Sequence, residues 1–385
     1  MRKGWEYKKL GEVCEVVTGT TPKTNIPEYW GKGHYWVTPA ELNDTTVYID
    51  KTERQITDEA LSKTKLRLLP VGTVLLSSRA PIGKVAIANA EMYCNQGFKN
   101  CICSEAIYNK YLFYFLRLKK DYLNSLGRGA TFKEISKSIV ESIKIPLPPL
   151  STQLAIVSEL DKINELIRLK KEQLKDFDNL AQSLFYEMFG DPVENEKGWE
   201  VKKIKDIATE KLSYGSGASA VPFNKSVRYI RITDINEYGE LKDEKVSPNI
   251  FDEKYLLAEG DILFARSGAT VGKTYLHKQN EIPCIYAGYL IRLRPNELLV
   301  LPNYVYYYTK SNYYKSFICA NQRVVAQPNI NAKQYGDLDI PLPPLPLQRL
   351  FAQRIEQIER EKSEVQKSIQ DLETLLASRM QYWFE

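Results

Sequence analysis

The sequence predicts a mixed α/β protein, of the α+β kind, in which two strand-rich segments alternate with two long helices. Three observations lead to this fold class: an internal repeat of half the chain, a helical pattern that closes each half, and matching strand patterns within the halves. A chain of 385 residues, 43% of them hydrophobic, is long enough to form several cores.

The repeat is visible at both ends of each half. Gly4-Trp5-Glu6 returns as Gly198-Trp199-Glu200, and the run Ile145 to Leu150 (Ile-Pro-Leu-Pro-Pro-Leu) returns as Ile340 to Leu345, at offsets of 194 and 195 residues. Gln153, three residues after the first run, returns as Gln348. A match at both ends of a long segment indicates a tandem duplication with a pseudo-twofold character. We expect strand-rich domains at 1–146 and 191–341 and long helices at 147–190 and 342–385.

Each predicted helix carries apolar residues at alternating steps of four and three. A period of 3.5 is typical of a coiled-coil seam, so we expect the helices to pair as an antiparallel coiled coil. The alternative left open is that each helix packs on its own domain. Gly190-Asp191-Pro192 should end the first helix. The expected seam residues are Ile156, Leu160, Ile163, Ile167, Leu174, Phe177 and Leu184 in the first helix, and Phe351, Ile355, Ile358, Val365, Ile369, Leu372 and Leu376 in the second.

Within each half, a turn leads into an apolar strand and then into a loop with an arginine and a glycine. The strands are expected at 71–77 and 259–265, and the loops run from Ser78 to Lys84 and from Arg266 to Lys273. Counted from arginine to glycine, the second loop is two residues longer. Aromatic helical stretches at 108–118 and around 304–308 follow in each half.

Composition excludes several classes of protein. The six cysteines form no CxxC pair and the two histidines, His34 and His277, stand far apart, so we expect no metal site. No signal peptide and no apolar run of about 20 residues is visible, so we expect a cytoplasmic protein without contact to a membrane. Residues 1–146 hold 22 Lys and Arg against 15 Asp and Glu, which suits a domain that faces phosphates, although an ordinary basic surface would look the same.

Taken together, these motifs resemble the specificity subunits of type I restriction–modification systems. The resemblance covers the whole chain, and its most specific element is Pro-Leu-Pro-Pro-Leu-x-x-Gln before a long helix, which occurs twice. It implies two target-recognition domains that each read one half of a split double-stranded DNA target. It also implies helices that set the spacing and dock two methyltransferase subunits, with motor and nuclease subunits in the full complex. S-adenosylmethionine, ATP and Mg²⁺ would then belong to the partners, and this chain would need no cofactor.

Enzymatic alternatives fail on spacing. The run Gly268 to Thr274 looks like a phosphate-binding P-loop but has three residues between its glycines where that loop needs four. A methyltransferase that flips adenine would need an Asn/Asp-Pro-Pro-aromatic motif, and every Pro-Pro pair here lies in Leu-Pro-Pro-Leu. A purely structural coiled-coil scaffold would explain the helices but not the two duplicated domains.

Base reading requires polar side chains on exposed loops. Arg79 and Arg266 are the first choices, with an ion pair to a nearby carboxylate as the alternative for each; Lys84 and Lys273 suit phosphates. Turn residues could serve as contacts or only as turns. The further candidates are Thr38, Glu41, Arg128, Thr131, Lys133, Arg231, Thr233, Asp234, Ser267, Gln322 and Arg323, and the tyrosines are expected in the core.

Overall fold

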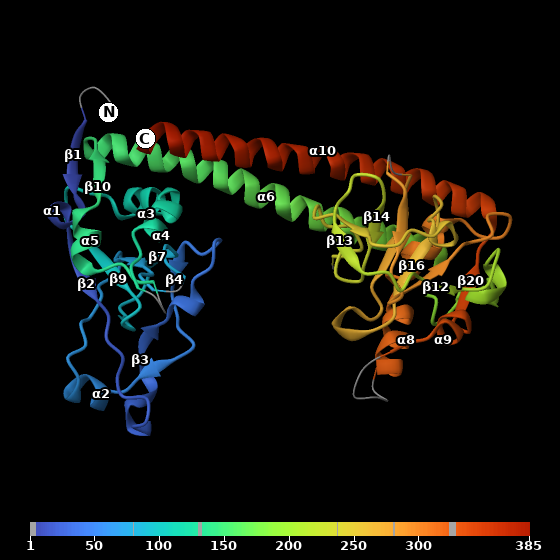
Figure 1. The fold of residues 1–385 in the computed structure, drawn as a ribbon, viewed down its shortest axis with the longest axis horizontal. Coiled ribbons are helices and arrows are strands. Elements are labelled where there is room, and N and C mark those ends of the chain that lie inside the picture. Colours follow the sequence, from blue (N-terminus) through green and yellow to red (C-terminus); the bar gives the residue numbers. More distant parts are fainter. Residues whose placement is uncertain (1–4, 80, 130–132, 237, 280–281, 323–328) are drawn as a thin grey trace. The chain divides into compact units, whose positions relative to one another are not determined.

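The computed structural model describes the chain except for residues 1–4, 80, 130–132, 237, 280–281 and 323–328 (Figure 1). The chain divides into two compact units: unit 1 consists of Met1–Lys171 and Lys367–Glu385, and unit 2 of Glu172–Gln366. The predicted fold class is confirmed, because strand-rich segments alternate with two helices of 40 residues each. Over the described residues, no helix is both long and apolar enough to cross a membrane.

In unit 1, a five-stranded sheet in the order β2-β9-β6-β7-β4 and a three-stranded sheet in the order β5-β3-β8 precede the first long helix. Helix α3 packs against β6 and β7. The strands are β1 (Glu6–Lys9), β2 (Cys14–Thr18), β3 (Trp30–Val37), β4 (Tyr48–Ile49), β5 (Gln55–Ile56), β6 (Val74–Leu76), β7 (Val85–Ala88), β8 (Tyr93–Cys94), β9 (Lys99–Cys103) and β10 (Lys144–Leu147). The α-helices are α1 (Leu10–Val13), α2 (Asp58–Lys63), α3 (Asn109–Leu118), α4 (Lys120–Ser125), α5 (Lys137–Ser142) and α6 (Leu150–Phe189).

Unit 2 contains a four-stranded sheet in the order β12-β19-β16-β17 and the separate strand pairs β13-β15 and β14-β18. Its strands are β11 (Glu200–Lys203), β12 (Ser213–Tyr214), β13 (Ala220–Pro222), β14 (Arg228–Ile230), β15 (Val246–Pro248), β16 (Ile262–Ala265), β17 (Thr274–Leu276), β18 (Cys284–Tyr286), β19 (Leu290–Leu293) and β20 (Asp339–Leu342). Its α-helices are the second part of α6, α7 (Pro302–Tyr308), α8 (Asn312–Gln322), α9 (Ala332–Gly336) and the first part of α10 (Leu345–Phe384).

The two motifs that reveal the repeat are partners in the fold. Strand β1 pairs with β10 in antiparallel register, Glu6 opposite Leu147, and β11 pairs with β20 in the same way, Glu200 opposite Leu342. The strands that begin at the glutamates of the Gly-Trp-Glu motifs, Glu6 and Glu200, therefore each form a two-stranded ribbon with the Ile-Pro-Leu run of the same unit. This pairing explains why the similarity is concentrated at both ends of each half.

A buried glutamine joins each ribbon to its long helix. Gln153 accepts a hydrogen bond from the Tyr108 amide at 2.8 Å and donates to the carbonyls of Ala106 and Pro148 at 3.0 and 2.9 Å. Gln348 accepts from the Leu301 amide at 2.7 Å and donates to a proline carbonyl of its own junction at 2.7 Å. Both side chains are fully buried, so the motif positions the helix on the domain that precedes it.

Within each unit the long helices run antiparallel and lie side by side (Figure 1). In unit 1, Arg379 pairs with Glu159, and Lys171 lies 2.7 Å from Glu373. In unit 2, Lys362 lies 2.7 Å from Asp178. Ten of the expected seam residues are less than 10% exposed, and Leu174, Phe177, Leu372 and Leu376 are partly buried.

The ends of both long helices complete the cores of the units. In unit 1, Phe384 near the end of α10 packs on Tyr111 and Phe115 of α3, at ring centroid distances of 5.0 and 5.8 Å. In unit 2, Phe185 of α6 and Phe351 of α10 pack with Tyr304 and its neighbours in one cluster. Helix α6 ends where Gly190 adopts a φ of +79°, as the sequence predicts.

Candidate nucleic-acid interface

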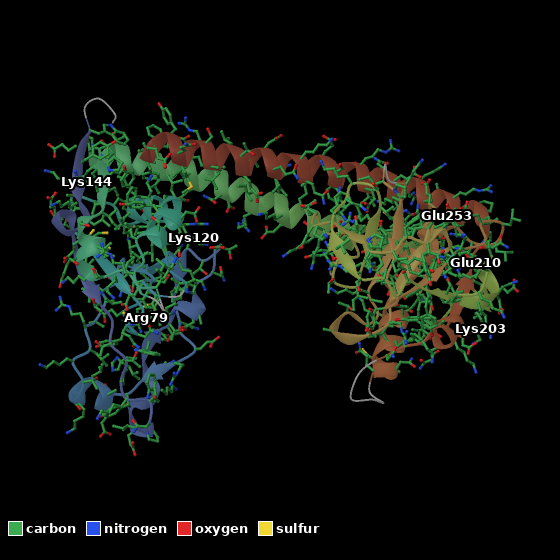
Figure 2. All side chains as sticks on the ribbon, in the orientation of Figure 1. Arg79, Lys120, Lys144, Lys203, Glu210 and Glu253 are labelled. Carbon is green, nitrogen blue, oxygen red and sulfur yellow. The ribbon has the colours of Figure 1, made fainter. Side chains whose placement is uncertain are left out.

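Arg79, labelled in Figure 2, lies between the end of β6 and the start of β7. The amide of Gly83 donates to the carbonyl of Ser77 at 2.9 Å, and the amide of Ser77 donates to Lys84 at 2.9 Å. Gly83 has a φ of +88°, which a glycine adopts without steric cost. The loop leaves the Arg79 side chain 44% exposed.

Arg79 forms an ion pair with Glu134. Its Nη2 and Nε lie 2.6 and 3.2 Å from Glu134 Oε2, and Lys99 Nζ lies 3.0 Å from Oε1. Burial raises the pKa of Glu134, but the hydrogen bonds from Arg79 and Lys99 outweigh that effect and hold the pKa below its ordinary value. The ion pair that the sequence analysis gave as the alternative for Arg79 is therefore present. The Glu134 carboxylate occupies the Nε and Nη2 edge of the guanidinium.

A short turn lies next to the Arg79 loop. The amide and hydroxyl of Thr38 donate to Glu41 Oε2 at 2.6 and 3.0 Å, which closes the 3-10 turn Pro39–Glu41. Lys84 Nζ donates to the carbonyl of Pro39 at 3.1 Å and so joins the loop to the turn. Thr38 and Glu41 thus have a structural role as turn residues, while a DNA contact for them stays a prediction.

Two further basic residues, Arg128 and Lys133, lie in the chain segment that ends at Glu134. The backbones of Arg128 and Glu134 exchange two hydrogen bonds of 3.0 Å, and the side chains of Arg128 and Lys133 are exposed. The carboxylate of Glu134 therefore binds Arg79 and Lys99, and the Glu134 backbone is paired with that of Arg128. Thr131 lies outside the described residues.

In unit 2 the corresponding loop is in a different register from the one expected. The amide of Arg266 donates to the carbonyl of Tyr289 at 3.1 Å, and the carbonyl of Arg266 accepts from the amide of Ile330 at 2.9 Å. In unit 1 the backbone of Ser78 makes the same two bonds, to the carbonyl of Gly97 and from the amide of Ile135. The backbone of Ser267 forms an isolated antiparallel β-bridge with Asn329, and Arg79 forms the corresponding β-bridge with Glu134.

The two arginines are therefore one position apart rather than equivalent. The matched returns run from Ser77 to Gly83 and from Ala265 to Gly272, so the second loop is one residue longer, not two. The expected correspondence was wrong because it aligned the arginines by identity, whereas the ladder of hydrogen bonds fixes the register. Adjacent positions nevertheless bring both side chains to the equivalent residues Glu134 and Asn329.

The side chain of Arg266 is held by neutral groups. Its Nε donates to Asn329 Oδ1 at 3.1 Å, and its guanidinium carbon lies 4.6 Å from the centre of the Tyr214 ring. Tyr214 is 41% exposed, and its hydroxyl accepts a hydrogen bond from the Ala332 amide at 3.0 Å. Within the described part of the chain, the ion pair considered for Arg266 does not occur.

The turn at Arg231 repeats the turn at Thr38. The amide, Nε and Nη2 of Arg231 donate to Asp234 at 2.8, 3.1 and 2.7 Å, and Asp234 is 4% exposed. Thr233 is exposed between them. Arg231 and Asp234 therefore stabilise the turn, as Thr38 and Glu41 do in unit 1.

The remaining predicted contacts of unit 2 are spread over the loop and α8. Ser267 and Lys273 lie at the two ends of the arginine loop and are half-buried, and Gln322 is the last residue of α8. Arg323 falls outside the described residues. A contact between DNA and any of these side chains stays a prediction.

Sequence reasoning missed three side chains of these clusters, Lys99, Glu134 and Tyr214. It placed Asn329 in a polar loop that could contact DNA, but not beside Arg266. Tyr111, Tyr304 and Tyr308 are buried, as expected of the tyrosines, but Tyr214 is not. Glu134 and Asn329 directly precede the isoleucines that pair with the arginine loops, a signal that the repeat contains but that no local motif marks.

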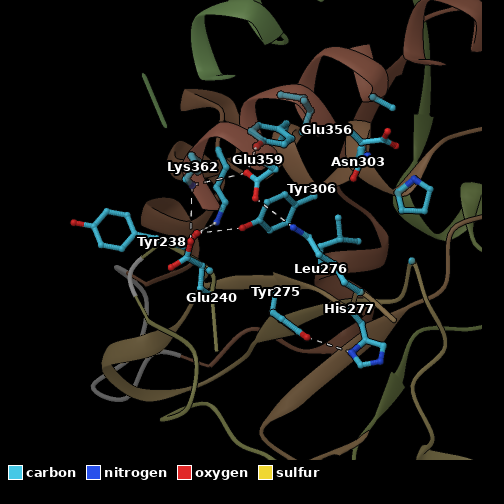
Figure 3. Close-up of a pocket in the computed structure, with 18 of the residues that line it drawn as sticks. Tyr238, Glu240, Tyr275, Leu276, His277, Asn303, Tyr306, Glu356, Glu359 and Lys362 are labelled. Atoms are coloured by element: carbon cyan, nitrogen blue, oxygen red, sulfur yellow. Dashed lines mark hydrogen bonds and ion pairs between the residues drawn. The ribbon is translucent and has the colours of Figure 1, made fainter. Parts of the chain in front are cut away.

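A hollow of about 1290 Å³ lies within unit 2 between the β-strands and the long helices (Figure 3). Lys310 Nζ donates to the carbonyl of Tyr238 at 3.4 Å, and burial lowers the pKa of this lysine to about 8. Lys362 lies near Asp178, Glu240 and Glu359, at 2.7, 3.8 and 3.8 Å. The contact of Lys310 with Tyr238 and that of Lys362 with Glu240 therefore anchor the turn at Tyr238–Glu240 to the helical part of unit 2.

Comparison with known proteins decides the family. The family described as "Type I restriction modification DNA specificity domain" matches residues 2–176 and 196–374, one copy in each half. The chain belongs to this family. The MjaIX specificity subunit of Methanocaldococcus jannaschii is 35% identical over 302 residues, which cover 70% of this chain and 67% of the relative. The MjaVIII specificity subunit of the same organism is 25% identical over 97% of this chain and 92% of the relative.

Two solved structures share the fold of this chain. One, from a study of the assembly and conformational transition of the type I restriction–modification system, has a TM-score of 0.65 at 20% identity and covers 99% of this chain and 97% of its own. The specificity subunit from M. genitalium has a TM-score of 0.54 at 16% identity, with coverage of 100% and 98%. The family expected from the repeated Pro-Leu-Pro-Pro-Leu-x-x-Gln motif is therefore confirmed.

Proposed function

We propose that this chain is the DNA-recognition subunit of a type I restriction–modification complex and acts in the cytoplasm. The domains at 1–146 and 191–341 would each read one half of a two-part target in double-stranded DNA. The observation that carries the proposal is that both units place an arginine at the end of a buried strand, beside an equivalent polar residue, Glu134 or Asn329. Base edges in the major groove are read by such side chains.

The long helices offer a surface for partner subunits. Leu150, Leu154, Leu166 and Leu169 of α6 are 46 to 48% exposed, outside the buried seam. Leu150 and Leu154 lie one turn apart on the helix, as do Leu166 and Leu169, and exposed apolar residues that lie together mark protein interfaces. We propose that methyltransferase subunits, two per complex, dock on the helices, and that motor and nuclease subunits join the full complex.

Catalysis would belong to those partners, together with S-adenosylmethionine, ATP and Mg²⁺. The loop that resembles a P-loop supports this assignment. Residues Gly268–Thr270 form a 3-10 turn, and Gly272 leads directly into β17, whereas a P-loop needs a following helix whose N-terminus faces the phosphates. We therefore propose that this chain binds no nucleotide.

The purified chain, alone and with its methyltransferase subunits, should select duplexes from a random DNA library. We expect two short specific blocks separated by unread bases. Arg79→Ala should relax one block and Arg266→Ala the other, each by about 1–3 kcal/mol, because each removes a base contact. Sequencing of the selected duplexes measures both effects.

The same preparation tests the absence of catalysis. The chain alone should neither hydrolyse ATP nor transfer methyl groups, and methylation should require the partner subunits and S-adenosylmethionine. ATP hydrolysis by the chain alone that is lost in a Lys273→Ala variant would contradict the proposal, as would a contiguous target or no enriched sequence.

A further inference from the structure

The environment of Arg266 specifies more than a general DNA contact. The backbone of Arg266 is fixed on both sides, by the bond to Tyr289 and the bond from Ile330, at the end of the buried strand β16. One edge of its guanidinium, at Nε, is bound by Asn329, and one face lies on Tyr214. These contacts fix the plane of the group, and among the described residues they leave the Nη1 and Nη2 edge for a ligand.

The support under Arg266 is itself anchored. Tyr214 ends strand β12, opposite Ile291 of β19, and its hydroxyl is tied to the amide of Ala332 at the start of α9. The next residue, Gly215, passes so close to the carbonyl of Tyr286 that a Cβ there would lie 2.3 Å from it. Tyr214 therefore has little freedom to move away from the arginine.

Charge separates this site from its counterpart in unit 1. Arg79 forms an ion pair with Glu134, a carboxylate that Lys99 shares, but the equivalent residue beside Arg266 is the uncharged Asn329. The position equivalent to Arg266 in unit 1 is Ser78, which is fully buried and donates to the carbonyl of Gly97 at 3.0 Å. Among the described residues, the guanidinium of Arg266 thus has no carboxylate bound to it, whereas Nε and Nη2 of Arg79 are both bound to Glu134.

A planar guanidinium with two parallel donors matches the O6 and N7 acceptors of guanine. A phosphate also accepts two such bonds, but a phosphate contact does not require a side chain held on its face and at its edge. Resting on the proposed function, we infer that Arg266 reads a guanine in the half-site bound by unit 2. Asn329 and Tyr214 are its positioning residues, and the half-site of unit 1 lacks a guanine read in this way.

Selection from a random duplex library by the full chain with its methyltransferase subunits tests the inference. One block of the wild-type motif should contain a guanine whose preference falls about 10- to 100-fold in Arg266→Lys, which keeps the charge but loses the fork. Asn329→Asp should lower the same preference by neutralising the arginine. Tyr214→Leu should lower it as well, and Tyr214→Phe should retain most of it because the ring remains.

The other block is the internal reference for folding and general affinity. It should be unchanged in every one of these variants, and Arg79→Lys should leave the guanine of unit 2 unaffected. Equal weakening of all sequences by Arg266→Lys would assign Arg266 to a phosphate and overturn the inference alone. A two-block motif without a guanine that responds to Arg266 would do the same, and a wild-type chain that enriches no motif would overturn the proposed function as well.

Discussion

At the scale of single residues, Glu134 determines what the arginine of unit 1 is able to do. It accepts hydrogen bonds from both Arg79 and Lys99, and the Lys99 side chain is only 6% exposed. A buried ammonium needs a carboxylate nearby, because desolvation of an unpaired charge is costly. Glu134 therefore has a structural partner as well as the arginine that we propose to face DNA.

Replacing Glu134 by glutamine should lower the free energy of unfolding of unit 1 by about 1–2 kcal/mol, since Lys99 then lacks its counter-charge. Burial and two cations act on the Glu134 carboxyl with a net lowering of its pKa. Its stabilising effect is therefore complete above the ordinary value of 4.5 and is lost as the pH falls through the lowered pKa.

Urea unfolding at pH 7 and at successively lower pH measures both effects of Glu134→Gln. The difference from wild type should shrink as the pH falls below 4.5. Glu15→Gln is the matched control, because its pair with Arg67 is more than half exposed on both sides and should contribute less than about 1 kcal/mol. Equal effects of the two substitutions would contradict the role given to Lys99.

Sequence reasoning reached Arg79 and Arg266 because each follows an apolar strand in a repeated loop. It could not reach their partners: Glu134 lies 55 residues from Arg79, and Asn329 lies 63 residues from Arg266. Contacts over such separations depend on how the sheets fold, not on a local pattern. The expectation of buried tyrosines failed at Tyr214 because a strand of two residues, Ser213–Tyr214, is too short to show alternation.

At the scale of elements, the long helices were the most predictable part of the molecule. Their period of 3.5 residues held over both copies, and the predicted seam residues are buried or partly buried. Two polar residues, Lys362 and Arg379, are in phase with the second seam. Lys362 is 8% exposed and bonded to Asp178 of the facing helix, and Arg379 pairs with Glu159. A polar pair at a seam position fixes the register of two helices at some cost in stability.

Short strands were less predictable than helices. The two strands expected at 71–77 and 259–265 are present as β6 and β16, but they span only Val74–Leu76 and Ile262–Ala265. Strands such as β4, β5 and β8 have two residues each, which is too few for a periodic signal. Their existence depends on the neighbours that they pair with.

The junction glutamine gives a prediction at this scale. Gln153→Leu should destabilise unit 1 by about 1–3 kcal/mol, because the amide of Tyr108 and two carbonyls lose their partner in a fully buried place. Gln370→Leu, an exposed glutamine of α10, is the control and should change stability by less than about 0.5 kcal/mol.

Hydrogen exchange of the peptides around 106–108 and 148–153 tests the prediction for Gln153 directly. Faster exchange should be confined to the junction of unit 1 in Gln153→Leu, and to the junction at 343–348 in Gln348→Leu. Exchange unchanged at both junctions would show that the repeated glutamine does not hold the helix on its domain.

At the scale of the whole molecule, the two structural units do not follow the chain consecutively. Unit 1 includes residues 367–385 from the end of the chain. There Phe384 packs against Tyr111 of α3, and Lys119 forms an ion pair with Glu385 at 2.8 Å. Both α6 and α10 therefore pass from one unit into the other, at Lys171–Glu172 and at Gln366–Lys367. A change of helix length at these two points leaves the interior of each unit intact.

The helices should therefore act as a ruler for the DNA target. Four residues inserted after Lys171 and four after Gln366 lengthen each helix by about 6 Å, at 1.5 Å per residue, and preserve the pairs Asp178–Lys362 and Glu159–Arg379 within the units. Since the base pairs of DNA are spaced by about 3.4 Å, the unread gap between the two blocks should grow by one or two base pairs. The sequences of the blocks should stay the same.

Motif selection by the double insertion variant and by wild type, each with the methyltransferase subunits, provides the measurement. Insertion into α6 alone is the matched control: it shifts the seam of α6 against that of α10, so stability should fall and both blocks should weaken without a new gap. Aspartate at Ile163 and Ile167, which are 7 and 8% exposed, should break the seam outright and abolish a defined spacing, because two charges would be buried. An unchanged gap in a stable double insertion variant would show that the spacing is set elsewhere, by the partner subunits or by the DNA.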